Sequence, residues 1–141
     1  MTYVNSYLQS KVMGADSLEL IIMLYERAIL ALNIAKEAIL QGVDDPEKVS
    51  KKAKELSKAT EILWYLNDIL DRQRGGQIAE NLSLIYTTLA GDLVKANLFN
   101  DVETIEKCLD ILNNLKLAWE DIRKQERESQ SEKRRVFAGT I

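Results

Sequence analysis

The sequence contains no histidine, and this absence excludes several classes of catalytic and metal site. A Ser-His-Asp triad, a Cys-His nucleophile, an HExxH zinc site and a Glu-x-x-His di-iron centre all require an imidazole. The single cysteine, Cys108, can form neither an internal disulfide nor a cysteine-rich metal site. We therefore expect no catalytic centre, no metal and no cofactor, and we predict that the protein is not an enzyme.

Glycine and proline are also scarce. Six glycines and one proline, Pro46, are too few in 141 residues for the frequent turns of an all-β domain. Apolar residues nevertheless make up 46% of the chain, which is enough to build a core of ordinary size. The composition therefore predicts a single all-α domain.

Long apolar runs are missing as well. The longest, from Leu20 to Tyr25, has six residues, whereas a membrane-spanning helix needs about 20. The first residues lack the charged start and the apolar stretch of a signal peptide. We expect neither membrane insertion nor export of this chain.

The net charge of −3 is divided unevenly along the chain. Residues 1–122 carry 13 basic and 19 acidic side chains, whereas residues 123–141 carry six basic and three acidic ones. An acidic body argues against nucleic acid as the main partner, because phosphate binding needs a basic face. We expect the basic end to be a solvated tail rather than a DNA-binding arm.

Four segments have the apolar periodicity of helices, and short loops separate them. Ser17 and Pro46 are typical first residues of helices, and Gly42 is a typical stop. The expected helices span residues 17–41, 46–72, 77–100 and 101–123. We predict an antiparallel up-down four-helix bundle over residues 17–123, with a short N-terminal leader at 1–16. We expect the charged tail at 124–141 to be partly helical at its start and otherwise mobile and disordered.

The chain has more apolar residues than one core stripe per helix requires. The surplus lies in the leader, in the first helix and in the second half of the second helix. A thick core, a homodimer interface or cover by the leader would each explain it. A groove for an amphipathic partner helix is the functional explanation.

Four sequence blocks and a closing tripeptide carry a family resemblance. They are Tyr7-Leu8-Gln9, Leu18 to Tyr25, Gly75 to Leu82, Ala96 to Asp101, and Leu117-Ala118-Trp119. In their order and spacing they resemble the FliS family of flagellin export chaperones over about residues 5–122. The chain departs from the family pattern where Glu26-Arg27 follows Tyr25 in place of Asp-Gly, and where Arg72-Gln73-Arg74 replaces a more acidic stretch.

The resemblance implies a cytoplasmic bacterial chaperone with a four-helix bundle. Such a chaperone binds the C-terminal segment of newly made flagellin one to one. It prevents premature polymerisation until flagellin is exported through the flagellar type III apparatus. Tyr7 matches the leader tyrosine that the family associates with contacts to partners and to the export gate, and the leader can cover part of the binding surface.

Ten residues are candidates for partner binding under this hypothesis. The lid candidates are Tyr7, Leu8 and Val12, the groove candidates are Ile22, Ile62, Tyr65, Leu66 and Ile69, and the lesser candidates are Asn81 and Tyr86. We expect polar substitutions at Ile62 and Ile69 to weaken binding while leaving the fold nearly unchanged. The alternative is a homo-oligomeric helical bundle with no flagellin client, in which the surplus apolar stripes meet each other.

Overall fold

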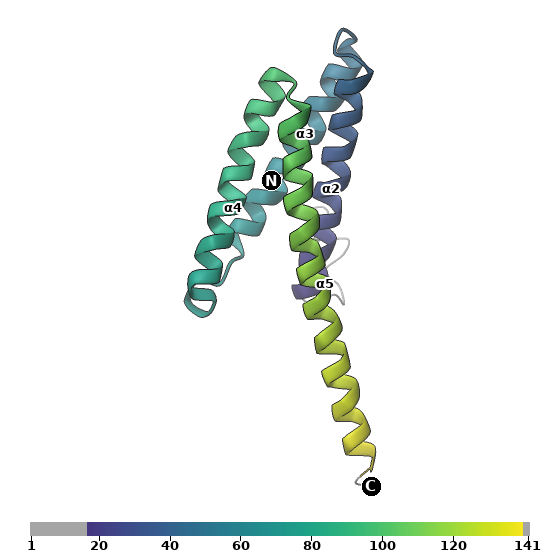
Figure 1. Ribbon diagram of the computed structural model, residues 1–141, viewed down its shortest axis with the longest axis vertical. Coiled ribbons are helices and arrows are strands. Elements are labelled where there is room, and N and C mark those ends of the chain that lie inside the picture. Colours follow the sequence, from purple (N-terminus) through teal and green to yellow (C-terminus); the bar gives the residue numbers. More distant parts are fainter. Residues whose placement is uncertain (1–16, 140–141) are drawn as a thin grey trace.

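The structure is a computed structural model that describes residues 17–139. It contains the helices α2 (Ser17–Gln41), α3 (Pro46–Asp68), α4 (Arg72–Phe99) and α5 (Val102–Gly139), and the described residues include no strand. Consecutive helices run in opposite directions (Figure 1). The prediction of an all-α, antiparallel four-helix fold is confirmed.

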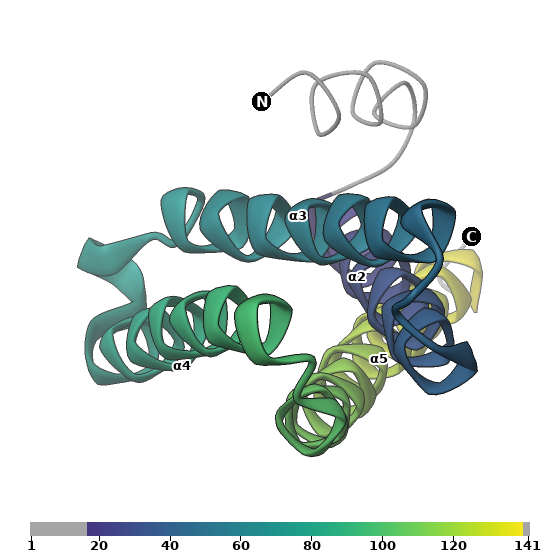
Figure 2. The ribbon, with the colours of Figure 1, turned by 90° about the horizontal axis from the view of Figure 1, so that it is seen from above.

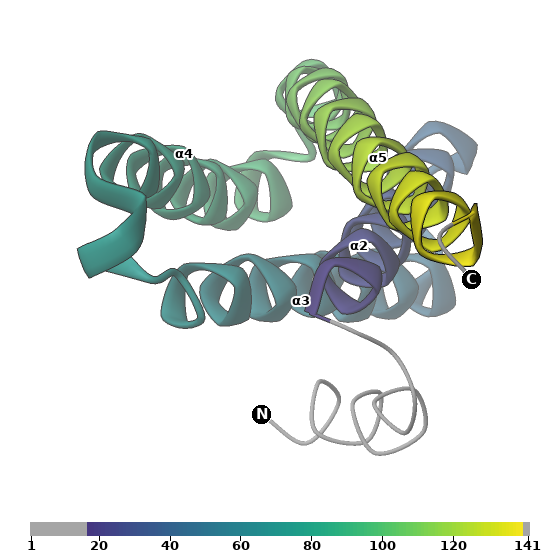
Figure 3. The ribbon, with the colours of Figure 1, turned by 90° about the horizontal axis from the view of Figure 1, so that it is seen from below.

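The helices do not pack with equal closeness. α2 packs against both α3 and α5, and α3 packs against α4, whereas α4 and α5 make far fewer contacts with each other. α4 and α5 diverge from the loop that joins them (Figure 1), and α3 runs beside both α2 and α4 when the molecule is seen from above (Figure 2). The view from below shows α5 next to α2 (Figure 3). The bundle is therefore open on the side between α4 and α5.

The core is centred on α2, which explains the surplus of apolar residues in this helix. Its buried residues are Ile22, Leu24, Tyr25, Ala28, Ala31, Leu32, Ala35 and Ala38. Half of them are alanines, which let neighbouring helices approach closely. Tyr25 meets Tyr86 of α4 in the core, where the two hydroxyl groups share a hydrogen bond of 2.5 Å. α2 is therefore the central helix of the bundle.

The boundary between the second and third helices differs from the prediction. α3 begins as expected, because the Asp45 carboxylate accepts a hydrogen bond from the Glu47 amide and Pro46 occupies the first turn. It ends at Asp68, however, and not near Arg72. Asp71 accepts a hydrogen bond from the Arg74 amide and so caps the start of α4, which places Arg72 in the following helix.

The double glycine is a kink inside α4 and not the predicted turn between helices. Gly76 has a φ of +50°, which L side chains rarely adopt, and it interrupts the helix after its first turn. At Gly75 a Cβ atom would lie 2.7 Å from the Cβ of Ala79. Both positions therefore require glycine for physical reasons.

α5 continues beyond the expected end at Arg123. The helix reaches Gly139, and residues 124–136 are all exposed. This stretch is rich in Glu, Gln, Lys and Arg, which are good helix formers even without a packing partner. Arg123 and Arg127 both donate hydrogen bonds to Glu19 Oε1, at 3.0 and 2.8 Å, and so hold the start of the extension against α2. The structure thus shows a helical extension where we expected a mostly irregular tail.

Candidate functional site: two apolar hollows beside α4

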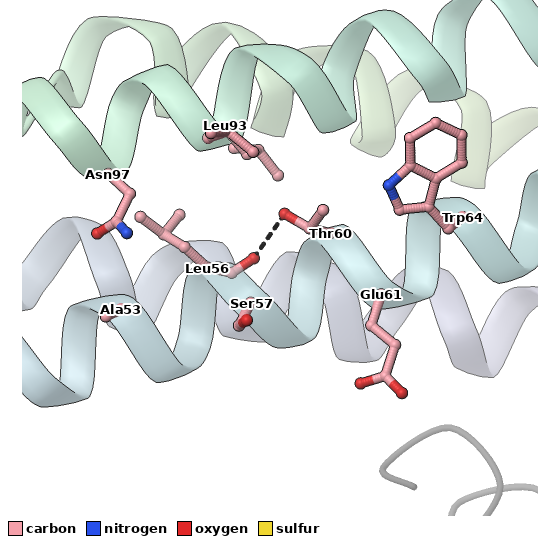
Figure 4. A pocket seen from close by; sticks show the side chains of 9 residues that line it. Ala53, Leu56, Ser57, Thr60, Glu61, Trp64, Leu93 and Asn97 are labelled. Carbon is pink, nitrogen blue, oxygen red and sulfur yellow. Dashed lines mark hydrogen bonds between the residues drawn. The ribbon is translucent and has the colours of Figure 1, made fainter. Parts of the chain in front are cut away.

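The first hollow lies between α3 and α4 and has a volume of about 580 Å³. We call it the α3–α4 groove; its lining residues are Ala53, Leu56, Ser57, Thr60, Glu61, Trp64, Leu93, Val94 and Asn97. Leu56 and Leu93 form its apolar floor, and the indole of Trp64 rises from α3 beside them (Figure 4). The Thr60 hydroxyl donates a hydrogen bond of 2.8 Å to the Leu56 carbonyl oxygen. This hydroxyl group therefore already has a hydrogen-bond partner within its own helix.

Trp64 makes this groove suitable for an apolar partner. It is 44% exposed, whereas tryptophans are highly buried on average. A second large apolar residue, Val94, is exposed on the opposite wall. The groove therefore offers apolar surface that a bound chain could remove from water.

The second hollow lies where α4 and α5 diverge and has a volume of about 350 Å³. We call it the α4–α5 pocket; its lining residues are Leu70, Asp71, Arg74, Gly75, Ile78, Ala79, Leu82 and Trp119. Ile78 is 71% exposed at its edge, and Trp119 is half-buried. The kink at Gly76 shapes this pocket, because it separates the first turn of α4 from Ile78.

Four of the predicted binding residues belong to the core. Ile22, Ile62, Leu66 and Tyr86 are each at most 2% exposed. Ile62 and Leu66 lie on the face of α3 that meets α2 and α4. The expectation that a polar substitution at Ile62 leaves the fold nearly unchanged is therefore not supported, because it would place a polar group in a close-packed interior.

Three other predicted residues are accessible. Tyr65 is half-buried and packs against the edge of the core, Ile69 is exposed at the end of α3, and Asn81 is exposed on α4. The Asn81 side-chain oxygen accepts a hydrogen bond of 2.9 Å from Gln77. None of the three lines either hollow, so the structure does not gather them into one site.

The lid candidates Tyr7, Leu8 and Val12 lie outside the described residues. Their proposed role as a lid stays a prediction.

Sequence reasoning selected none of Val94, Ile78, Trp64 and Trp119 as binding candidates. Ile78 lies two residues after the kink and is exposed. The Gly75-Gly76 pair was the available signal, and it was interpreted as a simple turn.

The titratable groups near the core favour a structural role. Burial, together with the negative charge of Asp92, raises the pKa of the Cys108 thiol to about 12. This thiol is therefore protonated near neutral pH and is a poor nucleophile. Burial also raises the pKa of Tyr25 and of Tyr86 above 10.0.

Residues 17–139 contain no group of three or more metal-ligating side chains that could hold an ion. In the same part of the chain, no helix is both long enough and apolar enough to cross a membrane.

Comparison with known proteins agrees with the resemblance described above. Residues 1–126 match the family model described as "Flagellar protein FliS". The flagellar secretion chaperone FliS of Salmonella typhimurium is 38% identical over 121 residues, which cover 85% of this chain and 86% of that protein. The proteins of the same description from Vibrio cholerae and Bacillus subtilis are 29% and 26% identical over 120 and 123 residues, covering 85% and 87% of this chain and the same shares of each relative.

Proposed function

The chain belongs to the FliS family of flagellar secretion chaperones, and from this premise we propose that it binds the C-terminal segment of flagellin in the bacterial cytoplasm. One chaperone holds one flagellin and prevents its polymerisation before export through the flagellar type III apparatus. FliS is not an enzyme family, and the binding requires no cofactor.

The observation that carries the proposal is the apolar surface left open beside α4. The α3–α4 groove and the α4–α5 pocket lie on two sides of one helix, and each exposes a tryptophan or an isoleucine. An extended client chain could fill both by wrapping around α4. An amphipathic segment that becomes helical in such grooves is a common mode of peptide recognition.

The leader has a regulatory role in this proposal. Tyr7, Leu8 and Val12 form a lid that covers part of the client surface in the free chaperone, and Tyr7 also contacts the export gate. Client binding then displaces the lid, so that part of the binding free energy is spent on opening it.

Calorimetric titration with a flagellin C-terminal peptide tests the proposal. We expect saturable one-to-one binding with a negative heat-capacity change, because burial of apolar surface lowers the heat capacity. A chain lacking residues 1–16 should bind more tightly if the leader is a competing lid. Absence of binding by both folded forms would contradict the proposal.

Substitutions in the groove test where the client binds. Trp64→Glu places a charge on the groove wall, and we expect the affinity for the peptide to fall at least about tenfold. Leu40→Gln is the matched control, because Leu40 is exposed on α2 and lines neither hollow. Equal affinities of the two variants would remove the α3–α4 groove from the binding site.

A further inference from the structure

The charged side chains of α3 are divided along its length. Residues 48–58 contain five lysines and one glutamate, which gives this part of the helix a net charge of +4. Residues 59–71, which complete α3 and the loop after it, contain three acidic residues and no basic one. Lys48 in the first turn and Asp68 at the end are in the order that opposes helix stability, since a helix favours negative charge at its start. The stability of α3 therefore does not explain this division.

The α3–α4 groove runs along the division. Ala53 lines one end of the groove, among the lysines, whereas Glu61 and Trp64 line the other end (Figure 4). The three lining residues that come from α4 are uncharged. Because α3 and α4 run in opposite directions, their helix dipoles oppose each other across the groove. The side chains of α3 therefore give the groove a positive end at Ala53 and a negative end at Trp64.

Lys52 strengthens the positive end. It is only 6% exposed, and its ammonium group donates hydrogen bonds to the Asn97 carbonyl oxygen at 2.9 Å and to the Asn100 side-chain oxygen at 2.6 Å. Both acceptors are neutral, and Lys52 forms no ion pair within residues 17–139. The last carbonyl groups of α4 offset only part of its charge, because a helix end carries about half a unit charge. Lys54 is exposed and adds a second positive charge at this end.

Glu61 is the charged lining residue of the negative end. Its Oε1 atom is buried and has no hydrogen-bond partner among the described residues, a state that costs free energy. The first N–H groups of a helix lack partners within their own helix, and a carboxylate group is well suited to accept from them. The next basic residue along the chain, Arg72, is bonded to Asn67 and Ser83 and does not line the groove. Glu61 therefore suits the start of a bound helix and not its end.

We propose that the flagellin segment lies in the α3–α4 groove as a helix antiparallel to α3, in the direction that the charge division of α3 selects. The N-terminal turn of the segment lies at Glu61 and Trp64, and its C-terminal turn lies between Ala53 and Asn97. The segment that the groove prefers carries its acidic side chains towards its C-terminal end. This inference rests on the proposed function, because it adds a direction and a charge pattern to the same site.

A nitroxide label on the bound peptide tests the direction. The peptide is the shortest flagellin C-terminal segment whose binding Trp64→Glu weakens, and it carries the label at its N-terminal end in one sample and at its C-terminal end in another. In NMR spectra of the full chain, the N-terminal label should broaden the amide signals of residues 61–64 most. The C-terminal label should broaden those of residues 53–57 and 97 most. The reverse pattern, or equal broadening at both ends from either label, would overturn the proposal.

Charge substitutions test what sets the direction. Lys54→Glu should weaken binding of the same peptide about two- to fivefold, and the loss should shrink at high salt. Glu61→Gln removes the opposite charge at nearly constant size and should weaken binding by a similar factor. Lys133→Glu is the matched control, because Lys133 is exposed on the extension of α5 and lines neither hollow. Its affinity for the peptide should equal that of the unsubstituted chain.

A change in the peptide completes this test. Replacement of the acidic residues in its C-terminal half by the corresponding amides should make its affinity insensitive to Lys54→Glu, because the interacting charges are then gone. If Lys54→Glu and Glu61→Gln both left the affinity for the original peptide unchanged, the charge division would not select the direction.

Failure of this inference is distinguishable from failure of the proposed function. Absence of binding by every flagellin peptide would contradict both. A peptide that binds in the reverse direction, or that ignores the charges at Lys54 and Glu61, would overturn only the inference. A peptide whose binding Trp64→Glu does not weaken lies outside the α3–α4 groove, and this result would overturn the inference as well.

Discussion

The Tyr25–Tyr86 pair is the polar contact at the centre of an otherwise apolar core. The two rings meet edge to face, with centroids 6.3 Å apart, and each hydroxyl group is the other's partner. A buried hydroxyl group that loses its only partner keeps its desolvation cost without compensation. The pair therefore links α2 to α4 only as long as both hydroxyl groups are present.

This dependence predicts a non-additive pair of mutations. Tyr25→Phe should lower the free energy of unfolding by about 1–2 kcal/mol, because it leaves the Tyr86 hydroxyl group buried without its hydrogen-bond partner. The double variant Tyr25→Phe/Tyr86→Phe should cost less than the sum of the two single variants, since it leaves no unpaired group. Urea denaturation of the four proteins measures the coupling. Strictly additive losses would show that the hydrogen bond contributes nothing to stability.

The same core predicts a loss of stability at alkaline pH. Folding raises the pKa of Cys108 from 9.0 to about 12, so the unfolded chain loses this proton first as the pH rises. The contribution is fully present below pH 9 and is lost progressively between pH 9 and about 12. Tyr25 and Tyr86 act in the same direction above pH 10, because burial raises their pKa as well.

Denaturation at several pH values between 7 and 11 checks this prediction. The unfolding free energy should begin to fall near pH 9. In Cys108→Ala, which is less stable overall because of the lost volume, the decline should begin nearer pH 10. Parallel curves for the two proteins would contradict the assignment to Cys108.

At the scale of the helices, the kink in α4 depends on its double glycine. Gly76→Ala should lower the free energy of unfolding by about 1–2 kcal/mol, because an L side chain is strained at a φ of +50°. Gly91→Ala is the matched control within the same helix, and it should raise stability by up to about 1 kcal/mol because its site is helical and open. Thermal unfolding at low protein concentration compares the two. Equal effects would show that the kink can relax without cost.

The helices themselves were predictable, but their buried faces were less so. Periodicity and caps indicated the starts of the first and second helices to within a residue, because these are local signals. Periodicity shows which residues share a face, but the choice of the face that meets the core depends on the neighbouring helices. For this reason Ile62 and Leu66 were assigned to a groove although they are core residues. The Gly75-Gly76 pair indicated an interruption of the helix. It did not show that the loop between α3 and α4 comes before the pair, so that the interruption lies inside α4.

The whole molecule combines a closely packed half with an open half. All four helices contribute side chains to the core, but α4 contacts the rest of the bundle mainly through α3. Both apolar hollows involve α4. A chaperone needs accessible apolar surface without loss of its own fold, and this division supplies both, since the exposed surface lies beside a helix that α3 holds in place.

The helical extension of α5 continues beyond the bundle to Gly139, whereas the family model ends at residue 126. A chain that ends at Arg127 retains both arginines that bind Glu19 and loses a stretch whose residues 128–136 are all exposed. We expect its unfolding free energy to stay within about 0.5 kcal/mol of the full chain, because surface residues without partners contribute little. Its helical circular dichroism signal should fall, while its affinity for the flagellin peptide stays the same.

A chain that ends at Ile122 loses both ion pairs and should be less stable by about 1 kcal/mol. If the chain ending at Arg127 lost stability or peptide affinity, the extension would have to contact the bundle or the client, and it would then be a working part of the chaperone.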